Sequence, residues 1–441
     1  MLADRPMRVA WTAILSIVCC AFALGCRTNG AATVRDRFYS GDLDAAEEAA
    51  IAIQDSRSGD ANIARLNQSM VQLFDGNAAA AEANLRAVRD QFDHLQQPNA
   101  VETASSMMTD DTKLAYAGED YERILLRVFL SLSSIFSGSG DATAYATQVI
   151  DEQERVLARN QKDSVAGFKR VALAPYLRAA LREERFTDSD DVRRSRAQVA
   201  SWEPDFRQGS IDLARSEQGN HSRPGHGVVY VVALVGRGPK KIQTTDRPSS
   251  QSLLIADRVL SAVLDHPLPP TVAPVPVARV VRDGGGPDSV RVFANGSAMG
   301  DTETITNIGV FAEQQYAAIY PRVVARAIVR RMLKKSAVYA MKDRLDASPN
   351  SIADVALTLG GIAWEGTEKA DVRCWSLLPD RIQVLRFELP AGSHRLSLQS
   401  VQGGQKGHGS EEVEVAVRDG RNTWMLAAFP VDRPVGQVLV R

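Results

Sequence analysis

One stretch, residues 116–149, constrains the fold of this chain more than any other. Large apolar side chains recur in it at spacings of three and four residues, which places them on one face of a helix: Tyr121, Ile124, Leu125, Val128, Leu132 and Ile135. Glu119 and Asp120 put negative charge where the first turn of that helix would begin. The run ends at the Ser-Gly-Ser-Gly segment 137–140, and Asp141 would open a second helix. We therefore predict a helical hairpin whose apolar face needs neighbouring elements to cover it.

The alanine-rich sequence before this hairpin repeats a turn made of glycine and a short polar residue. Gly41 and Gly76 are separated by nearly the tetratricopeptide period of about 34 residues, and Gly140 follows further on. Side chains suited to a crossing between paired helices lie five and nine residues past each glycine: Ala46, Ala50, Ala81, Leu85, Tyr145 and Val149. These degenerate repeats resemble tetratricopeptide repeats. They predict an α-helical array over residues 31–202.

The pattern changes after this array. Residues 203–227 are rich in glycine and proline and poor in apolar side chains, so we predict a linker and a domain boundary there. A run of β-branched residues bounded by glycines at 228–235 predicts a buried strand. Further strands are expected on either side of the Asn295-Gly296 turn, at 289–294 and 304–311.

The remaining sequence mixes helical and strand patterns. Alternating prolines and apolar residues at 269–281 predict an edge strand or a covering segment. A long helix is expected over 312–345, with Pro321 at a kink or a fresh first turn, and a shorter one over 352–359. The last strands are expected at 382–388, 395–399, 412–417 and 423–429. The predicted fold class is α+β, with a C-terminal module over 228–441 in which helices pack on a largely antiparallel sheet.

The N-terminus has the layout of a secretory signal peptide. Arg5 and Arg8 precede a mostly apolar run that ends at Gly25-Cys26. The junction resembles a bacterial lipobox, whose cysteine is lipidated, although Ala23 and Leu24 stand in reversed order. We therefore predict a signal peptide and anchor over residues 1–26, with Cys26 as the lipidation site. A plain secreted protein and an uncleaved anchor are the alternatives. Because Arg rather than Asp follows the cysteine, the resemblance favours the outer membrane, facing the periplasm.

Charge and cysteine content exclude several classes of protein. The formal net charge of −1 gives no electrostatic reason to expect a nucleic acid partner. Cys374 is the one cysteine beyond the N-terminal segment, so neither an internal disulfide nor a cysteine-rich metal site is expected in the body. His221 and His226 lack a third ligand at metal spacing. No metal, cofactor or catalytic residue is predicted.

Two groups of residues are candidate binding residues. Arg322, Arg326 and Arg330 lie four residues apart and would form a basic stripe opposite Val323, Ala327 and Ile328. Such a stripe is either a solvated face paired with carboxylates or a surface for lipid headgroups or an acidic polymer. The second group is Asp371, Arg373 and Trp375. It is either an internal ion pair beneath an aromatic cap or a cluster that faces a ligand.

From residue 118 onward the chain resembles a family of uncharacterised bacterial envelope lipoproteins with tetratricopeptide-like N-termini. Four segments carry the resemblance: GEDYERILLRVF (118–129), VVYVVALVGRGPKK (228–241), YPRVVARAIVRRMLKK (320–335) and TEKADVRCWSLLPDRIQVLRFELPAGSH (367–394). The resemblance implies a lipid anchor and a two-part architecture, and it supplies no catalytic residue.

These observations together predict a membrane-anchored envelope lipoprotein that acts as a non-enzymatic binding or scaffolding component. Its expected partners are envelope proteins, bound in a groove of the helical array, and the membrane, bound through the lipid anchor. The alternative is an envelope enzyme, for instance one acting on cell-wall polymer, with a site assembled from scattered residues.

Overall fold

The fold was analysed in a computed structural model of the chain. It describes residues 30–56, 59–96, 115–162, 169–185, 188–219, 221–264, 273–283, 285–344, 351, 354–355, 357 and 369–441. The predicted signal peptide and Cys26 lie outside these residues, as does most of the helix expected at 352–359.

The N-terminal region is a succession of helices, each packed against the next. They are α2 (Gly30–Ser40), α3 (Leu43–Asp55), α4 (Ala61–Phe74), α5 (Ala78–Leu95), α7 (Asp120–Ser137), α8 (Ala142–Lys162), α9 (Leu173–Glu183), α10 (Ser189–Trp202) and α11 (Arg207–Glu217). Helices α7 and α8 are the predicted hairpin, and all six side chains of its apolar stripe are buried. The prediction of an N-terminal helical array is confirmed.

The turns of this array lie where the glycines predict them. Gly41 and Gly76 adopt positive φ angles of 87° and 92°, which a residue with a side chain rarely does. Asp42 and Asn77 then cap α3 and α5, each by accepting a hydrogen bond from a backbone N–H of the first turn. The six crossing positions named from the repeat pattern are all buried. The repeat pattern therefore identified positions where helices pack closely.

The segment 203–227, predicted as a linker, contains a helix instead. Helix α11 lies within it, and Phe206 and Asp212 are buried. A Cβ at Gly209 would lie 3.2 Å from Phe206 and from Val199, so this glycine allows α11 to pack against α10. The sequence-based prediction had placed Gly209 in a loop. A domain boundary at this place stays a prediction.

Strand β1 (His226–Val235) is the centre of the main sheet, whose order is β12-β11-β1-β7-β6. It runs parallel to β11 and antiparallel to β7, so that Tyr230 lies opposite both Trp424 and Arg386. The other strands of this sheet are β6 (Glu303–Asn307), β7 (Arg381–Pro390), β11 (Asn422–Phe429) and β12 (Val435–Val440).

A second sheet, of order β10-β8-β4-β5 with β9 beside β8, is antiparallel. Its strands are β4 (Ser289–Ala294), β5 (Ser297–Asp301), β8 (Gly392–Gln402), β9 (Gln405–Gly409) and β10 (Val413–Val417). The predicted α+β class with a largely antiparallel sheet is confirmed.

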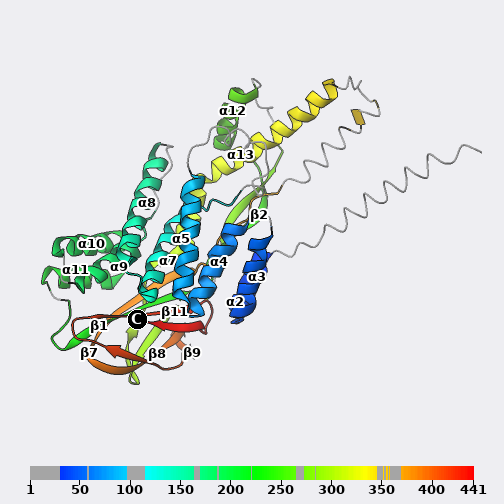
Figure 1. The fold of residues 1–441 in the computed structure, drawn as a ribbon. Helices are drawn as coiled ribbons and strands as arrows, with labels where there is room; N and C mark the ends of the chain where they lie inside the picture. Colours follow the sequence, from blue (N-terminus) through cyan, green and yellow to red (C-terminus); the bar gives the residue numbers. More distant parts are fainter. Residues whose placement is uncertain are drawn as a thin grey trace, which may run out of the picture.

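The two faces of β1 contribute to two different cores. Val228, Tyr230, Val232 and Leu234 pack with the N-terminal helices. The alternate residues pack with the second sheet: Val229, Val231, Ala233 and Val235. The body therefore has three layers, with the helices on one side of the main sheet (Figure 1). Burial on both faces explains why β1 reads as a continuous apolar run.

A smaller unit projects from this body, and we call it the arm (Figure 1). It consists of the paired strands β2 (Pro239–Asp246) and β3 (Val275–Arg282), helix α12 (Ser250–Leu264) and the later part of α13 (Ile308–Arg344). The arm has its own apolar cluster, which joins α12, β3 and α13. Helix α13 connects the two parts, because its first turns belong to the body core and its later turns to the arm.

Several local features differ from the sequence-based prediction, in the body as well as in the arm. Strand β6 ends at Asn307, whose side chain accepts a hydrogen bond from the N–H of Val310, so α13 begins within the strand expected at 304–311. The Asn295-Gly296 turn joins β4 to β5 rather than to that strand. Pro321 lies inside α13 and not at the first turn of a new helix, while the kink expected there as the other possibility stays a prediction. Strand β2 and helix α12 were not predicted.

Candidate functional site

A cavity of about 390 Å³ lies at the junction of the body and the arm. It is bounded by the segment before α7, by β2 and β3, by the middle of α13, and by residues 369–373. Eight of the twenty described lining residues are charged: Glu119, Lys241, Arg322, Arg326, Arg330, Lys369, Asp371 and Arg373. The structure thus brings five of the six candidate binding residues from the sequence into one place.

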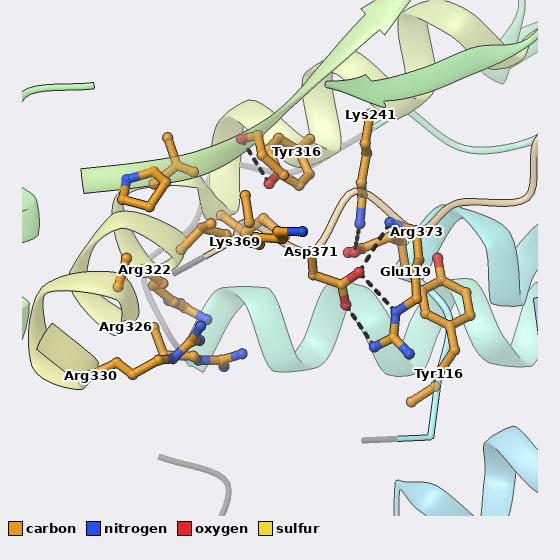
Figure 2. Close-up of a pocket in the computed structure, with 18 of the residues that line it drawn as sticks. Tyr116, Glu119, Lys241, Tyr316, Arg322, Arg326, Arg330, Lys369, Asp371 and Arg373 are labelled. Atoms are coloured by element: carbon orange, nitrogen blue, oxygen red, sulfur yellow. Dashed lines mark hydrogen bonds and ion pairs between the residues drawn. The ribbon is translucent and has the colours of Figure 1, made fainter. Parts of the chain in front are cut away.

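Helix α13 contributes the predicted basic stripe. Arg322, Arg326 and Arg330 extend from one side of the helix toward the same region (Figure 2). Arg326 is exposed, Arg322 is half-buried, and Arg330 is buried. The stripe does not lie opposite the apolar residues as predicted, because Val323 and Ala327 line the same cavity.

Lys241 of β2 lies at the other end of the cavity. It forms an ion pair with Glu119, the residue before α7, and its side chain is almost fully buried. Its Nζ lies 5.6 Å from the ring centroid of Tyr316, whose hydroxyl donates to the carbonyl of Ala278 at 3.0 Å. Burial lowers the pKa of Lys241, but the carboxylates of Glu119, Glu122 and Asp371 outweigh it and raise that pKa above its ordinary value. The ammonium group is therefore charged at neutral pH.

Asp371 and Arg373 form the second ion pair of the site, at 2.8 Å. The guanidinium of Arg373 also lies over the ring of Tyr116, 5.3 Å from its centroid. Burial raises the pKa of Asp371, but the hydrogen bonds and charge of Arg373 together with the charge of Lys241 hold it below its ordinary value. Figure 2 shows both ion pairs on the side of the cavity away from the three α13 arginines. The predicted ion pair exists, and its aromatic cap is Tyr116.

The start of α7 positions Glu119 and Tyr116 through a buried carboxylate. Glu122 accepts hydrogen bonds from the hydroxyls of Tyr116 and Tyr121 and from two backbone N–H groups, those of Glu119 and Trp375. Burial raises the pKa of Glu122. The backbone before this turn passes so close to Phe92 that a Cβ at Gly118 would lie 2.5 Å from its ring, and φ there is 72°. The turn that begins α7 therefore requires glycine.

Trp375 does not join the other candidate residues. Its side chain is fully buried in the body core, where its ring lies 5.4 Å from that of Phe129 between centroids. Its backbone N–H donates to Glu122 at 2.7 Å. Trp375 therefore holds the segment that carries Asp371 and Arg373 against α7, and it does not line the cavity.

Several lining residues were not singled out from the sequence, notably Lys241, Lys369, Tyr116 and Tyr316. The sequence does contain a Lys-Lys pair at 240–241, directly after the turn that follows β1. Lys240 pairs with Asp283, whereas Lys241, on the other face of β2, enters the cavity. Because side chains alternate between the two faces of a strand, recognising residues 239–246 as a strand would have placed Lys240 and Lys241 on opposite faces.

The charges of the described lining residues are unbalanced. Six basic side chains face two carboxylates. Arginine guanidinium groups present planar sets of N–H donors that match carboxylate and phosphate oxygens. The row of α13 arginines therefore presents a type of donor that suits an anion with several oxygen atoms, although Arg322 and Arg330 each take part in further interactions.

Within the described ranges, no group of three or more His, Cys, Asp or Glu side chains is placed to hold a metal ion. Among the helices that the structure describes, none is long and apolar enough to cross a membrane. Comparison of the chain with protein-family models, with curated proteins and with solved structures found no match.

Proposed function

We propose that this protein is a membrane-anchored envelope lipoprotein that acts as a non-enzymatic binding component and holds an anionic ligand in the cavity between body and arm. The observation that supports the ligand class best is the row of guanidinium groups that α13 presents to the cavity, with Arg326 exposed. The anchor and the envelope location rest on the signal peptide pattern and Gly25-Cys26.

Arg326 is the α13 arginine that is best placed to meet a ligand, because it lines the cavity and is exposed. In the cavity, Glu119 and Asp371 are each engaged by one cation, Lys241 and Arg373. Arg326 adds positive charge at the edge of this space, where electrostatic interactions are stronger than in bulk water.

Binding of envelope proteins along the N-terminal helices is a separate proposal. It rests on the repeat-like turns and on the general use of helical arrays as binding surfaces. The enzymatic alternative has less support. The described lining residues include no serine, cysteine or histidine, the usual nucleophiles and near-neutral general bases, and both carboxylates are in ion pairs.

Calorimetric titration of the full-length protein with inorganic pyrophosphate tests the anion site. Arg326→Glu should weaken binding about tenfold or more, since a charge-assisted hydrogen bond contributes about 1.5–3 kcal/mol. The matched control is Arg395→Glu, because Arg395 is an exposed arginine of β8 outside the cavity. Equal weakening by both substitutions, or no binding by the wild type, would contradict the proposal.

The anchor has its own test. Labelled palmitate should be incorporated into the wild-type protein and not into a Cys26→Ser variant. Equal labelling of the two proteins would show that Cys26 is not the lipidation site.

A further inference from the structure

A separate pocket, of about 690 Å³, lies on the body where β10 ends, β11 begins and β12 ends, and we call it the strand-end pocket. Its described lining residues come from these strand ends and from the turn after α9: Glu184, Ala416, Arg418, Arg421, Asn422, Thr423, Val440 and Arg441. Three of these residues are arginines and one is a carboxylate. The volume lies within the range of small-molecule sites, roughly 300–1,000 Å³.

The turn between β10 and β11 holds two of the arginines. The N–H of Arg421 donates to the carbonyl of Arg418 at 3.1 Å, so the two residues span a β-turn and their Cα atoms lie within about 7 Å of each other. The turn is also fixed to β1, because the N–H of Gly420 donates to the carbonyl of His226 at 3.0 Å and the N–H of Val228 donates to the carbonyl of Arg421 at 2.9 Å. The backbone that carries these two side chains is therefore preorganised.

Strand β12 places the third arginine beside β11. The N–H and the carbonyl of Arg441 are hydrogen-bonded to the carbonyl and the N–H of Trp424, at 2.9 and 2.7 Å. Trp424 is three residues, or roughly 10 Å, along the strand from Arg421. The guanidinium of Arg441 lies against Gly138 at the C-terminal end of α7, where a Cβ would overlap it. Because a helix C-terminus favours a cation, Arg441 also serves the fold.

Arg418 and Arg421 have no such second role. Both side chains are exposed, and among the residues that the structure describes none forms an ion pair or a hydrogen bond with either guanidinium. The carboxylate of Glu184 accepts a hydrogen bond from the first backbone N–H of β11 at 3.2 Å and does not pair with them. In this respect they differ from Arg322 and Arg330 of α13, which take part in further interactions.

This arrangement discriminates between ligand classes. Each guanidinium presents a planar set of N–H donors that matches the oxygens of one phosphate or carboxylate group. Two of them on one fixed turn can hold two such groups at once, which a single oxyanion group cannot exploit fully. The lining offers little to an apolar ligand, because Ala416 and Val440 are its only apolar members among the described residues.

We propose that the strand-end pocket binds a small polyanion that carries two or more phosphate or carboxylate groups. Arg418 and Arg421 bind separate groups of this ligand, and Arg441 adds positive charge at the β12 side of the pocket. This site shares no described lining residue with the cavity between body and arm. The two proposals can therefore fail independently.

The test is a calorimetric titration of the full-length protein carrying Arg326→Glu, a substitution that weakens the other cavity. The ligands are inorganic triphosphate, propane-1,2,3-tricarboxylate and, as the reference with one oxyanion group, inorganic phosphate. At least one of the two multivalent ligands should bind about tenfold or more tightly than phosphate, because it engages a second guanidinium. The tighter of the two shows whether the site prefers phosphate or carboxylate groups.

A matched pair of variants in this background assigns the binding to the pocket. Arg421→Glu should weaken the multivalent ligand about tenfold or more. The control is Arg433→Glu, because Arg433 is likewise exposed but lies after the other end of β11, outside the pocket. It should leave the affinity within about twofold. Both are surface substitutions, so both proteins should fold.

Hydrogen exchange locates the ligand independently of affinity. Saturating triphosphate or tricarboxylate, whichever binds more tightly, should slow exchange in residues 416–423. Equal weakening by Arg421→Glu and Arg433→Glu would overturn the proposal. So would multivalent ligands that bind no more tightly than phosphate, or protection that leaves residues 416–423 unchanged.

Discussion

The charged cluster around Arg196 and the cavity beside α13 are built from the same residue types. They differ in the ratio of basic to acidic side chains among the described residues and in their access to solvent. We call the first the closed cluster, and it consists of Glu183, Arg196, Asp212, Arg215, Arg386 and Glu388. Arg196 is fully buried, with Nη2 at 2.5 Å from Glu183 and Nη1 at 3.1 Å from Asp212. Three arginines there meet three carboxylates, and the exposed Arg223 also pairs with Glu388. In the cavity, six described basic side chains meet two.

The difference teaches how to tell a structural charge cluster from a candidate binding site. The closed cluster joins α9, α10 and α11 to β7, and Tyr230 of β1 adds a hydroxyl at 3.2 Å from Arg196. Its charges compensate one another within the fold, which a buried set must do to avoid a large desolvation cost. The cavity differs in that its lining includes the exposed guanidinium of Arg326. We therefore expect substitutions in the closed cluster to alter stability, and substitution of Arg326 in the basic stripe of α13 to alter binding.

The largest effect is expected from Arg196→Leu. The substitution leaves the buried carboxylates of Glu183 and Asp212 with fewer partners, so the free energy of unfolding should fall by about 3–5 kcal/mol. Chemical denaturation measures this difference. The control is Arg193→Leu, because Arg193 lies on the same helix in an exposed ion pair with Asp190, and it should change stability by less than about 1 kcal/mol. Similar losses in both variants would mean that the closed cluster is not a stabilising unit.

The next effect is a pH dependence from His221, whose side chain is 5% exposed beside the closed cluster. Burial, and to a lesser degree Arg386 and Arg215, lower the pKa of His221 from 6.5 to about 4. Because the unfolded chain then takes up the proton first, stability is full above pH 6.5 and falls as the pH drops toward 4. The loss from this group reaches at most about 3 kcal/mol.

Chemical denaturation of the wild type and of His221→Gln between pH 7 and pH 4 isolates this contribution. The variant should lose less stability than the wild type over that range, since it removes the titrating group and leaves the other groups in place. Parallel pH curves for the two proteins would exclude His221 as the cause.

Lys241 shares a property with each cluster. It is buried in an ion pair, as in the closed cluster, and it also lines the cavity. Lys241→Met removes the partner of Glu119 and should cost about 1–3 kcal/mol of stability. It should also weaken pyrophosphate binding, since it removes one of the six cations. A variant that loses stability but binds normally would place Lys241 with the structural charges.

The smallest effect on stability is expected from Arg326→Glu. Arg326 is exposed, and surface substitutions of this kind usually change stability by less than about 0.5 kcal/mol. Thermal unfolding of Arg326→Glu and of wild type should therefore nearly coincide, although anion affinity differs. A large drop in the unfolding temperature would show that Arg326 belongs to the fold, and it would weaken the distinction between the two clusters.

Parts of the site could be predicted from sequence because they are local. Spacing by four residues places Arg322, Arg326 and Arg330 on one side of any helix, and Asp371 and Arg373 are close enough along the chain to pair. That these two groups line the same cavity could not be predicted, because it depends on how α13 and the segment 369–373 pack against α7 and β2. No local pattern encodes those contacts.

The errors have physical reasons of the same kind. Gly209 looks like a loop residue in sequence, yet it is a contact point between α10 and α11. Trp375 looks like part of a polar cluster, yet burial against Phe129 removes it from the cavity. The helical array and the buried strand β1 were predicted well, because long periodic or continuous apolar patterns determine them.

Hydrogen exchange of the full-length protein with and without saturating pyrophosphate tests the central claim most directly, because it reports on both clusters and on the helical array in one experiment. The claim predicts slower exchange in residues 316–330 of α13 and in 369–373, with unchanged exchange in 183–215 around the closed cluster. Protection confined to α2–α5, or to the closed cluster, would contradict the assignment of the anion site to the cavity between body and arm.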